Sequence, residues 1–513
     1  MRAGGDRLTV LQCKFSAYLS WSQPFIHDLV TAVGRHVDNV VVCNRTENLD
    51  RFPVSRVVRF PVRYTTEPRL ALLAAAYLER TCGPDAIHAH FGWSGLRMLL
   101  MKQYLRIPLV VTFGGRDLAM QMRMPEFDRL YRVLLGAAER MVCVSEDLRG
   151  MLLEAGADPA RIEVIRRGTD LGRFAFVERA GRGPGSPLRA LMVGRLIEKK
   201  GHRYAFQALA ALVREGLDVH LTLVGEGEEY HRLRRLAREL GVRDRVHFAG
   251  TTDHAGVRAH MAEADLLLHC SVTGRSGDRE GIPNVVVEAQ ATGLPVVGTR
   301  HGGIVEVVRE GETGLLVEER DVEALAACLR RLADAPTRIA FGRAAGAFAR
   351  AELDLGRQVE RYVAIYEKLA AEYTPETERM RASFIPDDFS EIMDRTLRVQ
   401  TELSIAELSE RLVKGRSFDA GFAHAAARRG RLERLYDLKR FIPQPVKFPA
   451  KMLLGRALLG AIELRKRLAR RGRIEDPEEI DRRVADYFDR GGRLDVGGDD
   501  WGVVDDLLHW HPE

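Results

Sequence analysis

The sequence predicts an α/β protein with two doubly wound parallel-sheet domains in tandem, followed by a mostly helical extension. Apolar, β-branched runs alternate with helix-like segments twice along the chain. Strands that are apolar almost throughout, separated by helices, are typical of parallel sheets covered on both faces. A glycine- and proline-rich break at residues 180–186 separates the two cycles, and the alternation stops near residue 375.

Short apolar runs are the predicted strands. Those of the first domain, residues 1–180, are 8–13, 39–43, 86–90, 109–113 and 141–144. Those of the second domain, residues 187–350, are 189–193, 219–224, 245–248, 264–269, 295–298 and 314–317. We expect residues 351–374 to form a crossover helix back to the first domain and residues 375–513 to be a helical extension of unknown role. Such sheets bind ligands beyond the carboxyl ends of their strands, so two facing domains predict a cleft in which chemistry takes place.

The composition is that of a folded protein. The 513 residues are 46% hydrophobic and 29% charged, which excludes wholesale disorder, a fibrous repeat and a single small binding module. No apolar run reaches the roughly 18 residues that a membrane-spanning helix needs, and we expect no export signal. Six cysteines are scattered without a Cys-x-x-Cys pair, which indicates buried thiols in a reducing compartment and hence a cytoplasmic protein; they are Cys13, Cys43, Cys82, Cys143, Cys270 and Cys328.

Charge is concentrated near the C-terminus. The formal net charge is +6, but residues 428–473 carry 15 basic and 3 acidic side chains, and residues 474–513 carry 4 basic and 13 acidic ones. Within the basic part, residues 448–469 combine a leucine-rich face with lysines and arginines. Two interpretations stand: peripheral contact with anionic lipid on the inner face of the plasma membrane, or packing of the leucines on the folded body. Nucleic-acid binding is disfavoured because no recognised motif accompanies the charge.

The first candidate site follows the first strand of the second domain. Gly194 ends that strand, where the missing side chain lets a ligand approach the backbone, and Arg195 and Lys200 precede an amphipathic helix. Two cations beside the exposed amides of a helix start suit a diphosphate. The stretch is neither a Walker loop nor a G-x-G-x-x-G fingerprint. The alternative is that Lys199 and Lys200 are simply a solvated first turn.

The second candidate site is a pair of glutamates. Glu280 and Glu288 stand eight positions apart, and Pro283 and Asn284 between them are typical of a helix opening. Glu280 then lies in the loop before the helix, and Glu288 lies one turn inside it. Two carboxylates at a helix mouth can accept hydrogen bonds from sugar and ribose hydroxyls while the N-terminal amides hold phosphate. Either glutamate alone would more often be a surface residue.

Together these segments resemble a known family. The motifs are Gly194-Arg195 with Lys200-Gly201, Glu280-x7-Glu288 within EGIPNVVVEAQATGLPVVGT, then GGIVEVV, and in the first domain HAHFG, VVTFGGRD, VSEDLR and IRRGTDLGRF. From about residue 7 to residue 372 the chain is similar to retaining nucleotide-sugar glycosyltransferases of family 4, above all to the exopolysaccharide or colanic-acid type. The resemblance implies the GT-B fold, in which two Rossmann-like domains face a cleft.

The resemblance also implies a role for each candidate residue. Arg195 and Lys200 would hold the donor diphosphate and offset the charge that grows on the leaving group. Glu280 would hold hydroxyls of the transferred sugar, and Glu288 would hold the ribose. The remaining donor-binding positions would be Gly194, Gly281, Pro283, Asn284 and Val285. The family needs no metal and no other cofactor, and its front-face reaction lets the donor phosphate help deprotonate the acceptor, so that transfer proceeds with retention.

One segment departs from the family pattern. Relatives commonly carry His-Gly after Thr-Phe, where this chain has Gly114-Gly115. That histidine is implied to contact the sugar near the reacting carbon, so its loss bears on the rate or on the choice of donor. The cleft or acceptor side is predicted to include Gly114, Gly115, Arg116, Asp117 and His90. We expect Arg116 to add a charge, Asp117 to orient the loop, and His88 and His90 to be structural rather than catalytic.

The predicted function is therefore sugar transfer. The protein would move a hexose-type sugar from a nucleotide-diphosphate sugar to a glycan or lipid-linked acceptor, in exopolysaccharide or other cell-envelope synthesis. One alternative is a catalytically silent nucleotide-sugar-binding or scaffolding protein, which Gly114 in place of the histidine favours. Another is a sugar-nucleotide epimerase or a phosphorylase on the same scaffold, but an epimerase is expected to have several cleft carboxylates and no Glu-x7-Glu.

Overall fold

The computed structural model describes residues 7–15, 17–19, 23–119, 125–179, 185–274 and 279–396. The chain divides into two compact units, one formed by Met1–Thr65 with Ala74–Pro386 and the other by Thr66–Leu73 with Asp387–Glu513. The first unit carries both large sheets. The segment 448–469, most of the predicted helical extension and residues 180–184 of the predicted break lie outside the described residues.

The first sheet has seven parallel strands in the order β5-β3-β1-β6-β7-β8-β9. They are β1 (Thr9–Cys13), β3 (Asp38–Cys43), β5 (Val57–Arg59), β6 (Ala86–His90), β7 (Leu109–Phe113), β8 (Arg140–Cys143) and β9 (Ile162–Val164). The strand order reverses between β1 and β6, which is the switch point of a doubly wound sheet. β2 (Ala17–Tyr18) and β4 (Arg45–Thr46) form a small sheet of their own.

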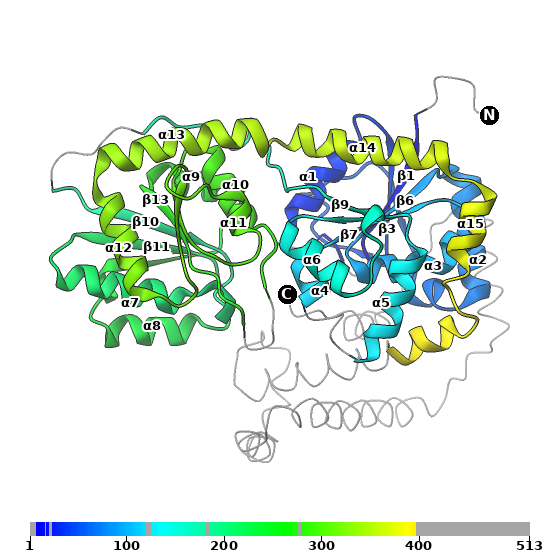
Figure 1. Ribbon diagram of the computed structural model, residues 1–513, viewed down its shortest axis with the longest axis horizontal. Helices are drawn as coiled ribbons and strands as arrows, with labels where there is room; N and C mark the ends of the chain where they lie inside the picture. The colour runs from blue at the N-terminus through cyan, green and yellow to red at the C-terminus, as the bar shows by residue number, and fades with distance from the viewer. Residues whose placement is uncertain are drawn as a thin grey trace, which may run out of the picture. The chain divides into compact units, whose positions relative to one another are not determined.

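The second sheet has six parallel strands in the order β12-β11-β10-β13-β14-β15. They are β10 (Leu188–Val193), β11 (Val219–Val224), β12 (Val246–Gly250), β13 (Leu266–His269), β14 (Val296–Thr299) and β15 (Gly314–Val317). Its switch point lies between β10 and β13. In Figure 1, α7 (His202–Arg214) and α8 (Tyr230–Glu239) lie on one side of these strands, and α9 (His254–Glu263) and α13 (Ala335–Glu352) lie on the other.

The remaining helices lie between the strands of each sheet or follow β15. Those of the first domain are α1 (Pro24–Val33), α2 (Pro68–Cys82), α3 (Gly92–Leu105), α4 (Gly115–Ala119), α5 (Pro125–Ala137) and α6 (Glu146–Glu154). Those that follow are α10 (Asn284–Ala291), α11 (Ile304–Val307), α12 (Val322–Ala333), α14 (Leu355–Glu372) and α15 (Pro375–Ala382).

Each large sheet has its own apolar core. In the second domain, Phe206 of α7 is fully buried and packs with Leu221 of β11. In the first domain, Tyr362 and Tyr366 of α14 are fully buried in one cluster with Val110 of β7. Tyr362 and Tyr366 are four residues apart and therefore lie on one face of the helix. α14 thus completes the core of the first domain.

The two parallel-sheet α/β domains confirm the predicted fold class. Every predicted strand is present, with its ends within two residues of the prediction. The prediction lacks β5 and β9, edge strands of three residues each, and the two-residue β2 and β4, because runs this short carry little apolar signal. Four of the six cysteines are buried, two are half-buried, and all are free thiols. Within the described ranges, no helix combines the length and the apolar character that crossing a membrane requires.

Candidate active site

The ion pair between Lys200 and Glu280 is the centre of the candidate site. β10 and β13 are neighbours at the switch point, so the turn after β10, which carries Lys200, and the loop after β13, which carries Glu280, begin at the same sheet edge. Lys200 Nζ lies 2.9 Å from Glu280 Oε1, and Lys199 Nζ lies 4.0 Å from the same oxygen. The side chains of Lys199 and Glu280 are 12% exposed, and that of Lys200 is 15% exposed. The interpretation of the two lysines as a solvated first turn is therefore wrong.

Electrostatics keep the Glu280 carboxylate charged. Burial by itself would raise the pKa of Glu280, but the ammonium groups of Lys200 and then Lys199 hold that pKa well below its ordinary value. An ammonium group has three donors, so Lys200 can hold Glu280 and an anionic ligand at the same time. The half-buried Arg195 follows β10, and a Cβ atom at Gly194 would stand 3.4 Å from the Lys200 stem. Lys199, Lys200 and Glu280 thus lie in one place, and the part of Arg195 stays a prediction.

The predicted helix opening is confirmed, because α10 begins at Asn284 with Pro283 as its N-cap residue. Val285 in the first turn is buried. Arg167, in the loop after β9, donates a hydrogen bond from Nη1 to Asn284 Oδ1 at 2.7 Å, and its guanidinium lies 3.7 Å from the ring centroid of Phe25. Burial lowers the pKa of Arg167 to about 10. Arg167 lies inside the motif IRRGTDLGRF, but the sequence predicts no role for it, because the motif does not show that Arg167 reaches Asn284.

Glu288 is the fifth residue of α10 and lies in a pocket that Asn284 and Asp28 also line. Burial, and then the neighbouring carboxylate of Asp28, raise the pKa of Glu288 to about 7, while the guanidinium of Arg173 acts in the opposite direction. Glu280 is not among the described residues that line this pocket. The two glutamates of the motif therefore occupy different electrostatic surroundings, one beside two lysines and one beside an aspartate.

The segment Gly114-Gly115 joins β7 to α4, whose second residue is Arg116. The buried Asp117 carboxylate accepts hydrogen bonds from the backbone N–H groups of Gly92 at 3.0 Å and Gly114 at 3.2 Å. One carboxylate therefore links the ends of β6 and β7. It fixes the backbone at Gly114, the position at which the family resemblance implies a histidine.

His88 and His90 of β6 are buried in the first domain. His88 contacts Thr112 Oγ1 through Nε2 at 2.8 Å and Tyr366 OH through Nδ1 at 2.6 Å, and His90 Nε2 lies 2.9 Å from Gln12 Oε1. Burial lowers the pKa of both imidazoles, that of His90 to about 3. Both rings are therefore neutral near pH 7. His88 links the sheet to α14, whereas His90 also lines the pocket described above.

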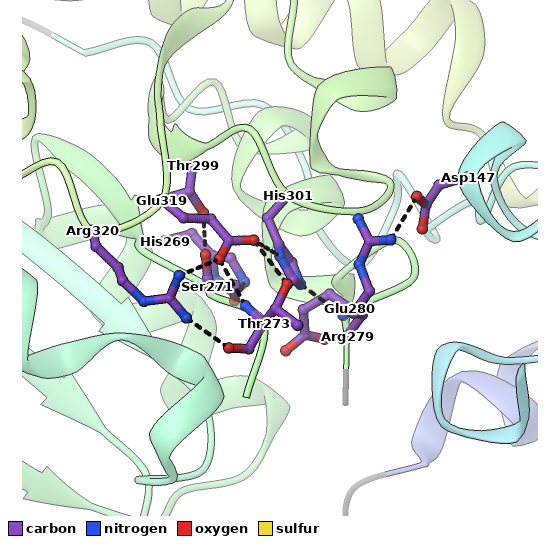
Figure 2. Close-up of polar contacts among 10 residues, drawn as sticks. All are labelled: Asp147, His269, Ser271, Thr273, Arg279, Glu280, Thr299, His301, Glu319 and Arg320. Atoms are coloured by element: carbon purple, nitrogen blue, oxygen red, sulfur yellow. Dashed lines mark hydrogen bonds and ion pairs between the residues drawn. The ribbon is translucent and has the colours of Figure 1, made fainter. Parts of the chain in front are cut away.

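A buried polar cluster contacts Glu280 and is not predicted by the sequence. Figure 2 shows His301 and Glu319 hydrogen-bonded to each other, with His301 also contacting the backbone of Glu280. These residues follow β14 and β15, and no local pattern marks them as members of a site. Of the residues that the structure describes, no three His, Cys, Asp or Glu side chains are grouped so as to hold a metal ion. Metal independence stays a prediction.

A carboxylate beside buried cations at the switch point of a doubly wound sheet suits a ligand that carries both hydroxyl and phosphate groups. Comparison with known proteins agrees with this chemistry. Residues 187–335 match the family model described as glycosyl transferases group 1, and residues 23–173 match the model described as Glycosyltransferase Family 4.

Two relatives extend this likeness. One is WcaL of Salmonella typhimurium, which carries a provisional name as a colanic acid biosynthesis glycosyltransferase. It is 34% identical over 291 residues, which are 56% of this chain and 71% of WcaL. The amylovoran biosynthesis glycosyltransferase AmsK of Erwinia amylovora is 31% identical over 274 residues, or 53% of this chain and 67% of AmsK.

Two solved structures share the fold. A glycosyltransferase from Rickettsia africae has a TM-score of 0.60 at 18% identity and covers 72% of this chain and 100% of its own. Anabaena Alr3699/HepE in complex with UDP and glucose has a TM-score of 0.59 at 20% identity, over 71% of this chain and 100% of its own. The fold and the site together define a two-domain glycosyltransferase. The chain belongs to the glycosyltransferase family that the two matching models describe.

Proposed function

We propose that this glycosyltransferase moves a sugar from a nucleotide-diphosphate sugar to a hydroxyl of a glycan or lipid-linked acceptor, with retention at the anomeric carbon, in exopolysaccharide or other cell-surface polysaccharide synthesis. The observation that carries the proposal is the largely buried pair of Lys200 and Glu280 at the switch point of the second sheet. The names of WcaL and AmsK support the polysaccharide role, and the UDP and glucose bound by HepE support the donor class.

The proposed chemistry is electrostatic. As the bond between the sugar and the diphosphate breaks, negative charge grows on the diphosphate, and preorganised cations stabilise it without reorganisation. Lys200, together with Arg195 from the same turn after β10, would supply that charge, and the Lys200 and Glu280 side chains are only 15% and 12% exposed. The same Lys200 holds Glu280 at 2.9 Å, so the carboxylate that binds sugar hydroxyls is fixed relative to the leaving group. Cations of the chain in this position take the part that a metal ion has in other transferases, which supports a metal-free reaction.

The remaining donor contacts follow from α10. Its opening at Asn284 presents backbone amides suited to phosphate, and Glu288 in the next turn presents a carboxyl group suited to the two ribose hydroxyls. In the proposed front-face reaction the donor phosphate helps to take the acceptor proton. This step assigns no general base to the protein, and it leaves the new bond on the face that the leaving group occupied.

The proposal places the reaction in the cytoplasm. Six free thiols, four of them buried, support a reducing compartment. A lipid-linked acceptor would bring the cleft to the inner face of the plasma membrane, and the basic, leucine-rich composition of residues 448–469 supports that contact.

The first experiment is a thermal-shift screen against UDP-, GDP-, ADP- and TDP-sugars, because a ligand that binds the native state raises its melting temperature. Nucleotide release with lipid-linked acceptors then measures transfer. Glu280→Gln and Lys200→Ala are expected to lower kcat by at least about 100-fold, since each removes a charge that acts on the reacting groups. The melting temperatures of both variants should show that the chain still folds.

Two matched controls keep this test specific. Glu215→Ala removes an exposed glutamate of the same domain that pairs with Arg330 at 2.6 Å, and Lys368→Ala removes an exposed lysine of α14. Both should transfer at the wild-type rate. Wild-type rates in Glu280→Gln or Lys200→Ala would refute the site assignment.

The silent-protein alternative has one observation in its favour. A Cβ atom at Gly114 would stand 2.9 Å from the ring of Phe91, so this ring occupies the space beside the position where relatives carry an imidazole. Binding of a nucleotide sugar without release of nucleotide, over the whole panel of lipid-linked acceptors, would favour that alternative over transfer.

A further inference from the structure

Three loops of the second domain meet in a hydrogen-bonded chain that ends on the backbone of Glu280 (Figure 2). His301, which follows β14, is fully buried, with Nδ1 2.6 Å from Glu319 Oε1. On the other side of the ring, Nε2 lies 3.0 Å from the backbone nitrogen of Glu280. Because β13, β14 and β15 are neighbours in the sheet, the loops after them lie side by side at its carboxyl edge.

The hydrogen bonds determine the tautomer of His301. A backbone N–H can only donate, so the Nε2 atom that faces Glu280 must accept and carries no proton. The proton of the neutral ring then lies on Nδ1 and is donated to the Glu319 carboxylate. The imidazole thus bridges the Glu319 carboxylate and the Glu280 backbone N–H, and only this tautomer satisfies both contacts.

Glu319 is itself held in place. One of its carboxylate oxygens accepts a hydrogen bond from Thr273 N at 2.9 Å, and the other accepts one from Thr273 Oγ1 at 3.0 Å. Arg320 Nη1 lies 3.3 Å from Glu319 Oε2. The bridge is therefore anchored at both ends, at the loop after β13 and at the end of β15.

The residues after His301 close on the same peptide. Gly302 has a φ of +51° and passes so near Glu280 that a Cβ atom there would overlap the Glu280 carbonyl oxygen. The backbone N–H of Gly303 donates to Gly281 O at 3.1 Å. Glu280 is thus fixed through its amide by His301 and through its carbonyl side by Gly302, while its carboxylate contacts Lys200.

We propose that His301 and Glu319 are positioning residues that hold the Glu280 backbone, so that its carboxylate stays aligned with Lys200 and with the sugar during transfer. This inference rests on the function proposed for Glu280. Displacement of a substrate-binding group by about 1 Å can lower a rate by on the order of 100-fold. Loss of either residue is therefore expected to lower the rate of transfer without either residue touching the substrate.

The test separates turnover from binding. His301→Ala is expected to lower kcat about 10- to 100-fold. The dissociation constants of UDP, GDP, ADP and TDP, used as probes, should change less than about threefold, because Arg195 and Lys200 are intact. His301→Gln should restore most of kcat, since its amide oxygen can accept from the Glu280 N–H. His231→Ala, an exposed histidine of α8, is the matched control and should keep the wild-type kcat.

A double-variant comparison tests whether His301 acts through Glu280. In a Glu280→Gln background, His301→Ala should lower kcat little further, because the carboxylate that His301 positions is already absent. Losses that multiply would overturn the positioning role, as would an unchanged kcat in His301→Ala of an active wild-type enzyme. If the wild type transfers no sugar from any nucleotide donor, the proposed function fails and the positioning role fails with it.

The tautomer gives a readout that needs no activity. In protein labelled with nitrogen-15 at histidine, the His301 signals are those that vanish in His301→Gln. They should report a neutral ring with the proton on Nδ1. A proton on Nε2, or a doubly protonated ring at pH 7.5, would overturn the hydrogen-bond arrangement whatever the enzyme assay gives.

Discussion

The carboxyl groups of Glu280 and Glu288 belong to one motif, yet their pKa values move in opposite directions. Burial raises both, but two lysines overcome it at Glu280, whereas Asp28 adds to it at Glu288. Two groups of the same chemical type are thereby given different charges near neutral pH. Glu280 stays an anion at neutral pH beside Lys200. Glu288 changes its protonation near pH 7, and this makes its contribution to stability depend on pH.

For Glu288 the sign follows from a folded-state pKa of about 7 against an ordinary value of 4.5. Below pH 4.5 the carboxyl is protonated in both states and has no effect. Between pH 4.5 and 7 the unfolded chain loses the proton first, so stability falls as the pH rises, and above pH 7 the cost is constant. Glu288→Gln removes that cost, which is on the order of 1 to 3 kcal/mol after allowance for partial exposure.

The expected result is that Glu288→Gln raises the melting temperature clearly at pH 8.0 and much less at pH 5.0. Glu178→Gln is the control, because Glu178 pairs with Arg343 at an exposed site where both side chains are more than half accessible. Its effect should not change between the two pH values. An equal shift for Glu288→Gln at pH 5.0 and pH 8.0 would contradict a raised pKa.

At the scale of secondary structure, the sequence predicts the features that depend on consecutive residues. These features are the strands of four or more apolar residues, the opening of α10 and the Glu280-x7-Glu288 spacing. The residues that the prediction lacks are brought together by strand order instead. His301 and Glu319 approach Glu280 because β13, β14 and β15 are neighbours, and Arg167 reaches Asn284 from the other domain. No window of the sequence contains those contacts.

The start of α4 is another such contact. A Cβ atom at Gly115 would stand 2.7 Å from Arg279 O and 3.0 Å from Gly281 N, so the first domain reaches the backbone on both sides of Glu280. Both neighbours are main-chain atoms, which cannot turn aside as a flexible side chain can. Gly115 is the first residue of the five-residue α4, so the preference of helix interiors for alanine over glycine does not offset this crowding.

Gly115→Ala is therefore expected to lower kcat by about tenfold or more and to leave the melting temperature unchanged or slightly lower, because the added Cβ atom crowds main-chain atoms of the loop that carries Glu280. Gly150→Ala is the matched control, since Gly150 lies in α6, where an added Cβ atom would meet no other atom within 4 Å, and should keep full activity. Both rates come from the nucleotide-release assay. Wild-type kcat in Gly115→Ala would show that the close approach to the Glu280 loop has no part in turnover.

Within the first compact unit, charged groups join the two sheet-bearing domains at several points. Glu306 of α11 accepts hydrogen bonds from the backbone N–H groups of Glu146 at 2.7 Å and Asp147 at 3.5 Å, which open α6. Its other oxygen lies 3.5 Å from Arg166 Nε. Arg279, the neighbour of Glu280, pairs with Asp147 at 3.1 Å. A glutamate of the second domain thus caps a helix of the first domain by accepting hydrogen bonds from its first amides, close to the Arg279–Glu280 segment.

That cap gives the domain contact a measurable signature. Glu306→Ala removes the acceptor of the Glu146 and Asp147 amides, so hydrogen exchange in a peptide covering residues 145–154 should speed up by on the order of tenfold. Since these contacts also hold the Arg279–Glu280 segment, kcat should fall while nucleotide binding persists. Asp321→Ala, which removes the cap that accepts from Ala324 N at 2.9 Å within the donor domain, should speed exchange in α12 only. Unchanged exchange at residues 145–154 in Glu306→Ala would mean that the two domains are not joined there in solution, and turnover would then owe nothing to this cap.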